Sequence, residues 1–427
     1  MFLHLYRFLS YLAAPFLYFY LKKRAHLGKE DIHRLHERRG IPSLKRPEGK
    51  LIWLHGVSVG ETLSLLSLIQ HLSKTYPQAY ILLTTGTVTA ANIIKDKLPP
   101  HAIHQYIPLD VYPWMQRFLN YWKPDVVGIT ESEIWPNMIS LCKKKSIPLY
   151  LINARLTEHS FQRWQRIPTL ARALFSSFTS IFAQSEKNAE RLRCFTDKGV
   201  HVMPNLKFAA NPLTYSEEDF KILSAVIKNR PTFVAASTHE GEETIILESF
   251  KDILKSHPNV LLFLVPRHPH RSHPIIKLID SYGFSYAQRS KEEMPNTHHS
   301  IYLIDTMGEL GLMYALSPIA LVCGSLVPAI GGHNPIEPAQ LGCCVLWGPF
   351  MHNAEDICEI MGPYSLEVTA NNLTEILTNL LSHPHEAQEK GEALKNFMSI
   401  QKNSLKDLVQ LCQPYLSDSH ENPRILV

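Results

Sequence analysis

The sequence predicts an α/β protein made of two doubly wound parallel sheets, each covered by helices. Three observations favour this fold class. The chain has 427 residues and 45% hydrophobic content, which indicates two domains of roughly 200 residues each rather than one core. Short apolar runs alternate with helix-period segments, as strands and connecting helices do in parallel sheets. The alternation stops once, near the middle of the chain, and then resumes.

The first half of the chain contains five apolar runs that we interpret as buried strands. Helical patterns follow the first three runs, over residues 61–72, 89–98 and 135–145, so the order resembles consecutive βαβ units. The expected strands are LIWLHG (51–56), YILLTTG (80–86), VVGITES (126–132), PLYLINAR (148–155) and SIFAQS (180–185).

A polar stretch with Pro204 and Pro212, VMPNLKFAANPLTYSEED (202–219), interrupts the pattern and is typical of an interdomain linker. The pattern then resumes in five further apolar runs. The expected strands are TFVAAS (232–237), VLLFLVP (260–266), IYLID (301–305), IALVCGS (319–325) and CCVLWG (343–348). We therefore predict a first domain over 22–205, a linker over 206–218 and a second domain over 219–427, the two domains facing a cleft.

Residues 2–21 differ from the rest of the chain and predict a membrane-anchor helix over 1–21. They carry many aromatic side chains and one formal charge, Arg7, over a length close to that of a bilayer span. Nine Lys or Arg and three acidic residues follow over 22–46, a net +6 in a chain whose net charge is +4. Such flanks stay cytoplasmic and attract anionic lipids. A cleaved signal peptide is the competing interpretation, but no basic region precedes the apolar run. Because Arg7 and Pro15 interrupt the run, spanning and interfacial placements both stay open.

Composition and missing motifs exclude several classes of protein. Seven cysteines include no CxxC pair, so we expect neither a structural metal nor a disulfide framework. The histidines near 268–273 have no recurring ligand spacing, and we predict no metal site. Neither GxGxxG nor GxxxxGK[ST] occurs, which counts against a dinucleotide oxidoreductase and a P-loop enzyme. Outside 22–46 the chain is slightly acidic, and we expect no nucleic-acid partner.

Four predicted helices begin directly after a predicted strand with the spacing of a capping box. The pairs are Ser58/Glu61, Ser237/Glu240, Thr306/Glu309 and Asn334/Glu337. A cap stabilises a helix by ~1 kcal/mol and needs no ligand to explain it. Glycines stand beside every pair, and glycine near a first turn is better explained by a ligand that approaches the backbone. The pattern around Asn334 and Pro335 therefore predicts either an anion at a helix N-terminus or a plain capped helix.

A second cluster, ITESEIWPN (129–137), brings Glu131 and Glu133 together behind a predicted strand. Paired carboxylates are suited to acid–base chemistry, although they are also common on exposed loops.

The motifs taken together resemble the 3-deoxy-D-manno-octulosonic acid (Kdo) transferase family of lipopolysaccharide biosynthesis. The resemblance extends from the anchor to about residue 348. Its motifs are HGVSVGE (55–61), TTGTVT (84–89), ITESEIWPN, NARLTEHS (153–160), FAQSE (182–186), NLKF (205–208), AASTHEGEE (235–243), VPRHP (265–269), DTMGELG (305–311) and GGHNPIEPA (331–339).

The resemblance implies a membrane-associated, inverting, metal-independent glycosyltransferase of the GT-B fold. Its donor substrate would be CMP-Kdo, its acceptor a lipid A precursor, and its location the cytoplasmic face of the cell inner membrane. No further cofactor is implied. The alternative is another GT-B enzyme, such as a nucleotide-sugar hexosyltransferase or epimerase. A non-catalytic nucleotide binder is a third interpretation, which the presence of Glu61 and Glu131 disfavours.

Site residues follow from the same resemblance. Glu61 corresponds to the family's general base, and Glu131 and Lys207 correspond to positions that stabilise the transition state. Ser237, Thr238, His239 and Arg155 are expected nearby. The segments that correspond to the CMP-binding site contain Pro266, Arg267, Met307, Gly308, Glu309, Asn334, Pro335, Ile336 and Glu337. Arg267 and the amides near Asn334 would bind the phosphate, and Glu337 the ribose.

Overall fold

The computed structural model describes residues 2–228, 230–403 and 405–416, and the chain divides into two compact units. The first unit comprises Met1–Ala210 and Gln401–Val427, and the second comprises Asn211–Ile400. The boundary at Ala210 lies within the predicted linker. The sequence-based division ran to residue 427, whereas the residues from Gln401 on belong to the first unit.

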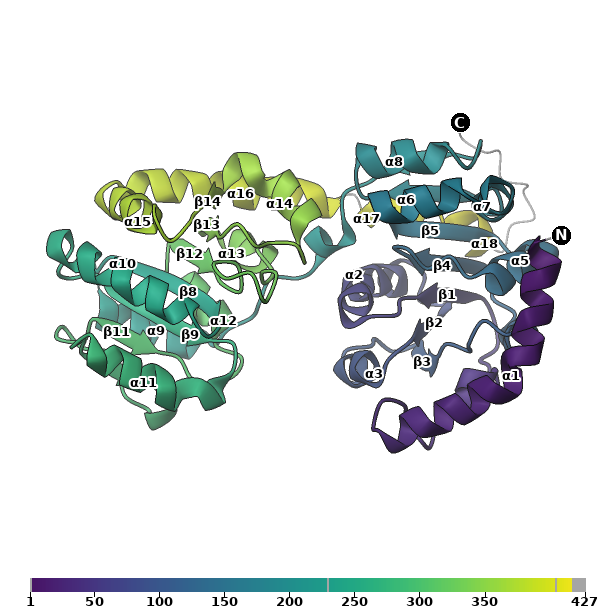
Figure 1. The fold of residues 1–427 in the computed structure, drawn as a ribbon, viewed down its shortest axis with the longest axis horizontal. Coiled ribbons are helices and arrows are strands. Elements are labelled where there is room, and N and C mark those ends of the chain that lie inside the picture. Colours follow the sequence, from purple (N-terminus) through teal and green to yellow (C-terminus); the bar gives the residue numbers. More distant parts are fainter. Residues whose placement is uncertain (1, 229, 404, 417–427) are drawn as a thin grey trace. The chain divides into compact units, whose positions relative to one another are not determined.

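The first unit is a seven-stranded parallel sheet with the order β3-β2-β1-β4-β5-β6-β7 (Figure 1). Its strands are β1 (Leu51–His55), β2 (Tyr80–Thr85), β3 (Ala102–Tyr106), β4 (Val126–Thr130), β5 (Leu149–Ala154), β6 (Ser180–Ala183) and β7 (Val200–Val202). Its helices are α1 (Phe2–His26), α2 (Val59–Thr75), α3 (Val88–Ile94), α4 (Tyr112–Trp122), α5 (Pro136–Lys144), α6 (Glu158–Gln165), α7 (Pro168–Phe175), α8 (Glu186–Arg193), α17 (Leu405–Gln410) and α18 (Gln413–Leu416). Two short 3₁₀ helices are η1 (Glu37–Arg39) and η2 (Leu206–Ala209).

The second unit is also a seven-stranded parallel sheet, with the order β10-β11-β9-β8-β12-β13-β14. Its strands are β8 (Thr232–Thr238), β9 (Leu261–Pro266), β10 (Tyr286–Gln288), β11 (Ile301–Leu303), β12 (Ile319–Val322), β13 (Cys344–Trp347) and β14 (Leu366–Glu367). Its helices are α9 (Glu217–Ile227), α10 (Glu242–Ser256), α11 (Ser272–Ser281), α12 (Leu310–Ala315), α13 (Ile336–Leu341), α14 (Glu355–Met361) and α15 (Leu373–Ser382), and α16 (Pro384–Asn403) continues across the unit boundary. Three 3₁₀ helices are η3 (Pro269–Arg271), η4 (Arg289–Lys291) and η5 (Gly362–Tyr364).

Alternate residues of the central strands enter separate cores on the two faces of each sheet. In β1, Leu51 and Trp53 belong to one core, and Ile52 and Leu54 to the other. Residues of β8 divide in the same way. Strands buried on both faces read as continuous apolar runs in the sequence, which is why these strands could be predicted. The prediction of two doubly wound parallel sheets is confirmed.

Helix α1 packs one face on α4 and α5 of its own unit (Figure 1). The guanidinium of Arg7 lies 4.1 Å from the ring centre of Tyr112, and the Tyr6 hydroxyl donates to Asp110 Oδ2 at 3.1 Å. Asn137 Nδ2 donates to Ser10 Oγ at 3.1 Å. Within the described residues, no helix combines the length and the apolar character that a bilayer crossing requires, so the predicted anchor has no support as a transmembrane span.

Candidate functional site

The strand order reverses in the middle of each sheet, and Glu61, Glu131, Arg267 and Asn334 follow strands at or beside these points. The reversal lies between β1 and β4 in the first unit and between β8 and β12 in the second. Ligands of doubly wound sheets bind beyond the carboxyl ends of the strands at such points.

Glu61 lies in the first turn of α2, directly after β1, and is 8% exposed. Its Oε2 accepts hydrogen bonds from Val57 N at 2.9 Å and Thr130 Oγ1 at 3.3 Å. Its Oε1 accepts from Ser58 N at 3.3 Å and Ser58 Oγ at 2.7 Å. Glu61 N in turn donates to Ser58 Oγ, so the predicted capping box is present. Four donors thus fix the carboxylate at the β1/β4 edge.

Glu131 follows β4 with a backbone φ of 55°, in the left-handed region that few residues other than glycine adopt. The conformation is held because Glu131 N donates to Ile152 O at 3.0 Å, and Arg155 N donates to Glu131 O at 3.4 Å. Strained backbone of this kind is concentrated at functional sites. The backbone geometry of Glu131 therefore indicates a functional position independently of the sequence motif.

Glu133 is partly buried two residues further on, and the sequence analysis singled it out without giving it a role. Its Oε2 accepts a hydrogen bond of 2.5 Å from Trp135 Nε1. Burial, with the charges of Glu61 and Glu131, raises the pKa of the Glu133 carboxyl to about 7, against the lowering effect of the indole bond. A carboxyl with this pKa exchanges protons near neutral pH.

Lys207 lies in η2 and is partly buried. Asn153 is a residue of β5 with a φ of 56°. Its Oδ1 accepts from Leu206 N at 3.1 Å. Asn205 Oδ1 accepts from Lys207 N at 3.0 Å. Since β1, β4 and β5 are neighbours, the structure brings the elements that carry Glu61, Glu131 and Lys207 to one edge of the first sheet.

In the second unit, Glu242 at the start of α10 connects the ends of β8 and β12, and it is 0% exposed. Its Oε2 accepts from Gly324 N at 2.7 Å and His239 N at 3.0 Å. Its Oε1 accepts from Ser325 N at 3.0 Å and Leu326 N at 2.9 Å. Sequence reasoning missed this residue, although a glutamate directly after a strand and a glycine could have indicated it.

Histidine and arginine side chains gather at the ends of β8, β9 and β12. The Nε2 atoms of His239 and His333 lie 2.8 Å apart, and the two rings stack. Burial, together with the neighbouring His239, Arg267 and His268, lowers the pKa of His333 to about 4. Pro266 ends β9, and Arg267 is exposed, with its N–H donating to Thr238 O at 3.0 Å. This cationic edge is suited to an anionic ligand.

The glycines that precede Asn334 fold back on the end of β12. Gly331 and Gly332 have φ values of 93° and 80°, and Gly332 N donates to Gly324 O at 2.7 Å. A Cβ on Gly332 would collide with the Met351 side chain, so only glycine fits there. The loop itself therefore accounts for these glycines, without a ligand.

The predicted capping box at Asn334 and Glu337 is wrong. Helix α13 begins at Ile336, after Pro335. Asn334 Oδ1 accepts from Ile336 N at 3.1 Å, but the Glu337 carboxylate accepts from Asn334 Nδ2 at 3.2 Å instead of from a backbone amide. Glu337 is largely buried, which raises its pKa, while Asn334 and Arg267 lower it.

Two more predicted boxes are absent, and one of them lies in the loop that carries Met307, Gly308 and Glu309. Helix α12 begins at Leu310, one residue after Glu309, whose Oε1 accepts from Arg289 Nε at 3.1 Å and from Thr306 Oγ1 at 3.3 Å. Met307 is 74% exposed and Gly308 has a φ of 86°. Helix α10 begins after Gly241 instead of after Ser237. The spacing of residues alone could not predict that Glu309 pairs with Arg289, or that α10 begins only after Gly241.

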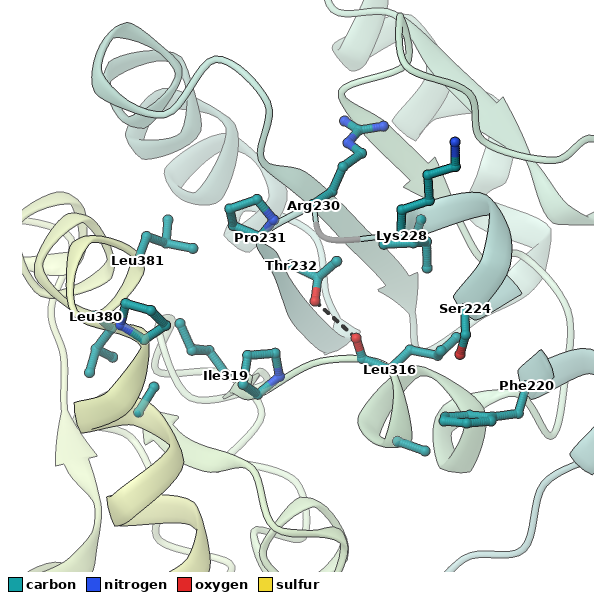
Figure 2. A pocket seen from close by; sticks show the side chains of 15 residues that line it. Phe220, Ser224, Lys228, Arg230, Pro231, Thr232, Leu316, Ile319, Leu380 and Leu381 are labelled. Atoms are coloured by element: carbon teal, nitrogen blue, oxygen red, sulfur yellow. Dashed lines mark hydrogen bonds between the residues drawn. The ribbon is translucent and has the colours of Figure 1, made fainter. Parts of the chain in front are cut away.

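A cavity of about 420 Å³ lies at the opposite, amino ends of β8 and β12 (Figure 2). Its wall is mostly apolar, and Thr232 Oγ1 donates to Leu316 O at 2.9 Å beside it. Because ligands of such sheets bind at the carboxyl ends, the cavity is not part of the candidate site. Across the residues that the structure describes, no group of three or more His, Cys, Asp or Glu is arranged to hold a metal ion.

Comparison with known proteins gives one consistent result. Residues 33–210 match the family model described as 3-deoxy-D-manno-octulosonic-acid transferase. The chain is 35% identical to a probable mitochondrial 3-deoxy-D-manno-octulosonic acid transferase of Arabidopsis thaliana, covering 92% of this chain and 91% of that protein. It is 34% identical to a 3-deoxy-D-manno-octulosonic acid transferase of Haemophilus influenzae, covering 90% and 91%. Its fold is similar to that of a UDP-GlcNAc 2-epimerase from Neisseria meningitidis, with a TM-score of 0.58, 17% identity and coverage of 85% and 99%.

Proposed function

Because the chain belongs to the 3-deoxy-D-manno-octulosonic acid (Kdo) transferase family, we propose that it transfers Kdo from CMP-Kdo to a lipid A precursor and releases CMP. The observation that carries the proposal is the Glu61 carboxylate, fixed by four donors beyond β1 at the reversal of strand order. A general base needs a fixed direction toward the hydroxyl that it deprotonates.

The proposed reaction is a single displacement with inversion, without a metal ion. The acceptor hydroxyl oxygen forms a bond to the anomeric carbon of Kdo, and its proton passes to Glu61. The bond from that carbon to the phosphate oxygen breaks, and CMP leaves with the electron pair. Glu131 and Lys207, on the neighbouring elements, are proposed to stabilise the charges that change in the transition state.

The donor half of the proposal rests on the cationic edge of the second unit. Arg267 and the backbone around Asn334, Pro335 and Ile336 are proposed to bind the CMP phosphate, since Arg267 is exposed at the end of β9 and supplies positive charge beside a short helix start. Glu337 is proposed to accept from ribose hydroxyls. Pro266 and the segment Met307, Gly308 and Glu309 are proposed to contact the nucleotide, and the high exposure of Met307 supports such a contact.

CMP release tests the function directly. The full chain is incubated in detergent with CMP-Kdo, a lipid A precursor and EDTA. We expect CMP release from the wild type and a loss of about 10²- to 10⁴-fold in kcat for Glu61→Gln. Glu186→Gln, an exposed residue of α8, is the matched control and should keep full activity. Absence of CMP release from the wild type would exclude Kdo transfer. UDP release from a UDP-sugar supplied in place of CMP-Kdo would favour a hexosyltransferase.

We further propose that α1 lies in the membrane interface at the cytoplasmic face of the cell inner membrane. One face of α1 packs on its own unit, while a row of aromatic and apolar side chains is exposed on the other. The row consists of Leu5, Phe8, Leu9, Leu12, Phe16, Phe19 and Tyr20. This spacing follows one helix face, as in helices that lie in an interface.

A cavity of about 390 Å³ beside the end of α1 supports binding to anionic lipids. Its lining includes Lys22, His26, His36 and Arg39. The Arg39 guanidinium lies 4.7 Å from the ring centre of Tyr18, so the arginine is held against α1. Clustered positive charge of this kind attracts lipid phosphates.

A further inference from the structure

The environment of Glu133 suits a group that accepts a proton, yet the proposed reaction does not use this residue. It lies on the loop between β4 and α5, and its backbone N–H donates to Thr130 O at 3.3 Å. Its carboxylate is partly buried and accepts the 2.5 Å hydrogen bond from Trp135 Nε1. A loop glutamate with no structural task would be expected to extend into water.

Two contacts connect this loop to Glu61. The ring of Trp135 meets the ring of His55 edge to face, with 5.4 Å between the ring centres. Thr130 Oγ1 lies 3.0 Å from His55 O and 3.3 Å from Glu61 Oε2, so its hydroxyl proton is shared between these two acceptors. Glu133 and Glu61 are therefore held by one set of contacts around the end of β1.

The two carboxylates differ in what stabilises their charge. Glu61 accepts hydrogen bonds from Val57 N, Thr130 Oγ1 and both donors of Ser58. Glu133 accepts one, from the indole of Trp135. Donors stabilise an ionised carboxylate, and burial with few donors favours the protonated form. Where two neighbouring carboxyls have such different environments, they commonly divide acid–base work between them.

We propose that Glu133 is a positioning residue of the transfer reaction that acts through Glu61, by receiving the proton that Glu61 takes from the acceptor hydroxyl. The inference rests on the proposed function. The acceptor O–H bond breaks, the oxygen bonds to the anomeric carbon of Kdo, and CMP leaves with the electrons of the broken C–O bond. The proton passes from Glu61 to Glu133 and from Glu133 to water, so both carboxyls are ionised again before the next turnover.

Several charged or titratable groups surround Glu133. Burial, together with Glu61 on α2 and Glu131 on the same loop, raises the pKa of Glu133 to about 7. Buried His55 on β1, with a pKa lowered to about 4 by burial, stays neutral in this range. Asp110 accepts from Asn137 N at the start of α5, and burial raises its pKa to about 6. Arg155 faces the loop through its carbonyl, which accepts from Ser132 Oγ at 2.7 Å. The Glu133→Gln variant separates Glu133 from Asp110.

The first test is the pH profile of kcat for CMP release. In the wild type, kcat should fall as the pH decreases through about 7, because a protonated Glu133 accepts no further proton. Glu133→Gln should lose this step and lower kcat by about tenfold or more, with KM for CMP-Kdo nearly unchanged. Glu133→Asp should restore part of kcat and the step itself. A purely structural role would lower stability without removing the step.

The second test needs no substrate and therefore separates this inference from the proposed function. Trp135 fluorescence, taken as the difference between wild type and Trp135→Phe, is followed from about pH 5 to about pH 9. We expect a titration near pH 7 that disappears in Glu133→Gln. In the activity assay, Trp135→Phe should move the step to higher pH, since the indole bond lowers the pKa of Glu133. A Trp135 signal without titration in this range, or an unchanged kcat profile in Glu133→Gln, overturns the inference.

Discussion

The Glu242 carboxylate accepts a 2.7 Å hydrogen bond from Gly324 N, so a side chain of α10 holds the loop after β12. Ser325 N, Leu326 N and His239 N complete its four donors. Glutamine has one acceptor oxygen, and its NH₂ group would face N–H donors. We expect Glu242→Gln to leave at least one buried amide without a partner and to lower the free energy of unfolding by about 3 kcal/mol. Urea unfolding of the full chain measures the loss. A matched change at exposed Glu240, Glu240→Gln, should leave stability within about 0.5 kcal/mol.

Gly332→Ala should destabilise the loop before Asn334 for two reasons. The φ of 80° is strained for alanine, and its Cβ would collide with Met351. We expect a loss of about 2–4 kcal/mol in the free energy of unfolding and a higher KM for CMP-Kdo. Gly283→Ala is the control, because Gly283 has a φ of 72° but no atom within 4 Å of an added Cβ. Its cost should be about 1–2 kcal/mol with an unchanged KM. Equal losses in the two variants would contradict the packing argument.

Replacement of Glu131 separates backbone strain from chemistry. Its φ of 55° is easily adopted by glycine. We expect Glu131→Gly to be about 1 kcal/mol more stable than Glu131→Ala, and both variants to lose CMP release. Thermal unfolding and the activity assay measure the two effects. Full activity in the glycine variant would show that the turn matters and the carboxylate does not.

His55 should make the free energy of unfolding depend on pH. The ring is fully buried, and its Nδ1 contacts Thr84 Oγ1 at 2.9 Å. Burial lowers its pKa from 6.5 to about 4. Between these values the unfolded chain binds a proton that the folded chain does not, so stability falls as the pH decreases below about 6.5. The loss should approach about 3 kcal/mol near pH 4. Denaturant unfolding at several pH values should show a shallower slope in His55→Asn, and identical slopes would refute the assignment.

Membrane binding through α1 should depend on its exposed row. Phe16 is 76% exposed and Phe19 66% exposed, so serine at either position removes little packing. We expect Phe16→Ser and Phe19→Ser each to weaken binding to anionic vesicles by about tenfold, with unchanged thermal unfolding. Buried Leu21 is the contrasting position, where Leu21→Ala should lower stability. Vesicle sedimentation measures binding. Unchanged sedimentation of both serine variants would mean that α1 does not enter the interface.

All ten strands expected from the sequence are present, and the four strands that were missed share one property. They are β3, β7, β10 and β14, the edges of the two sheets. An edge strand has a hydrogen-bonded neighbour on one side only and is often short. It therefore needs no continuous apolar run. The His104 and Gln105 side chains of β3 and the exposed His201 and Val202 of β7 reflect this freedom.

The parts of the candidate site that depend on residues close in sequence could be predicted. The parts that depend on contacts between residues far apart in sequence could not. The Ser58/Glu61 box is local, and its prediction is confirmed. The start of α12 depends on Arg289, twenty positions from Glu309, and the role of Glu242 depends on amides beyond position 320. No spacing rule includes such partners. The assignment of catalytic and CMP-binding roles stays a prediction.

The return of the chain to the first unit has a consequence for synthesis on the ribosome. Leu408, Val409 and Cys412 pack in the core that contains Leu54 and Leu68. Tyr76 Oη donates to Val409 O at 3.2 Å, and the hydroxyls of Tyr150 and Tyr415 lie 3.0 Å apart. The sheet that is translated first is thus covered by residues that are translated after the whole second unit. A nascent chain holds an uncovered apolar face throughout that interval, and the second unit has all of its own strands before the first unit is complete.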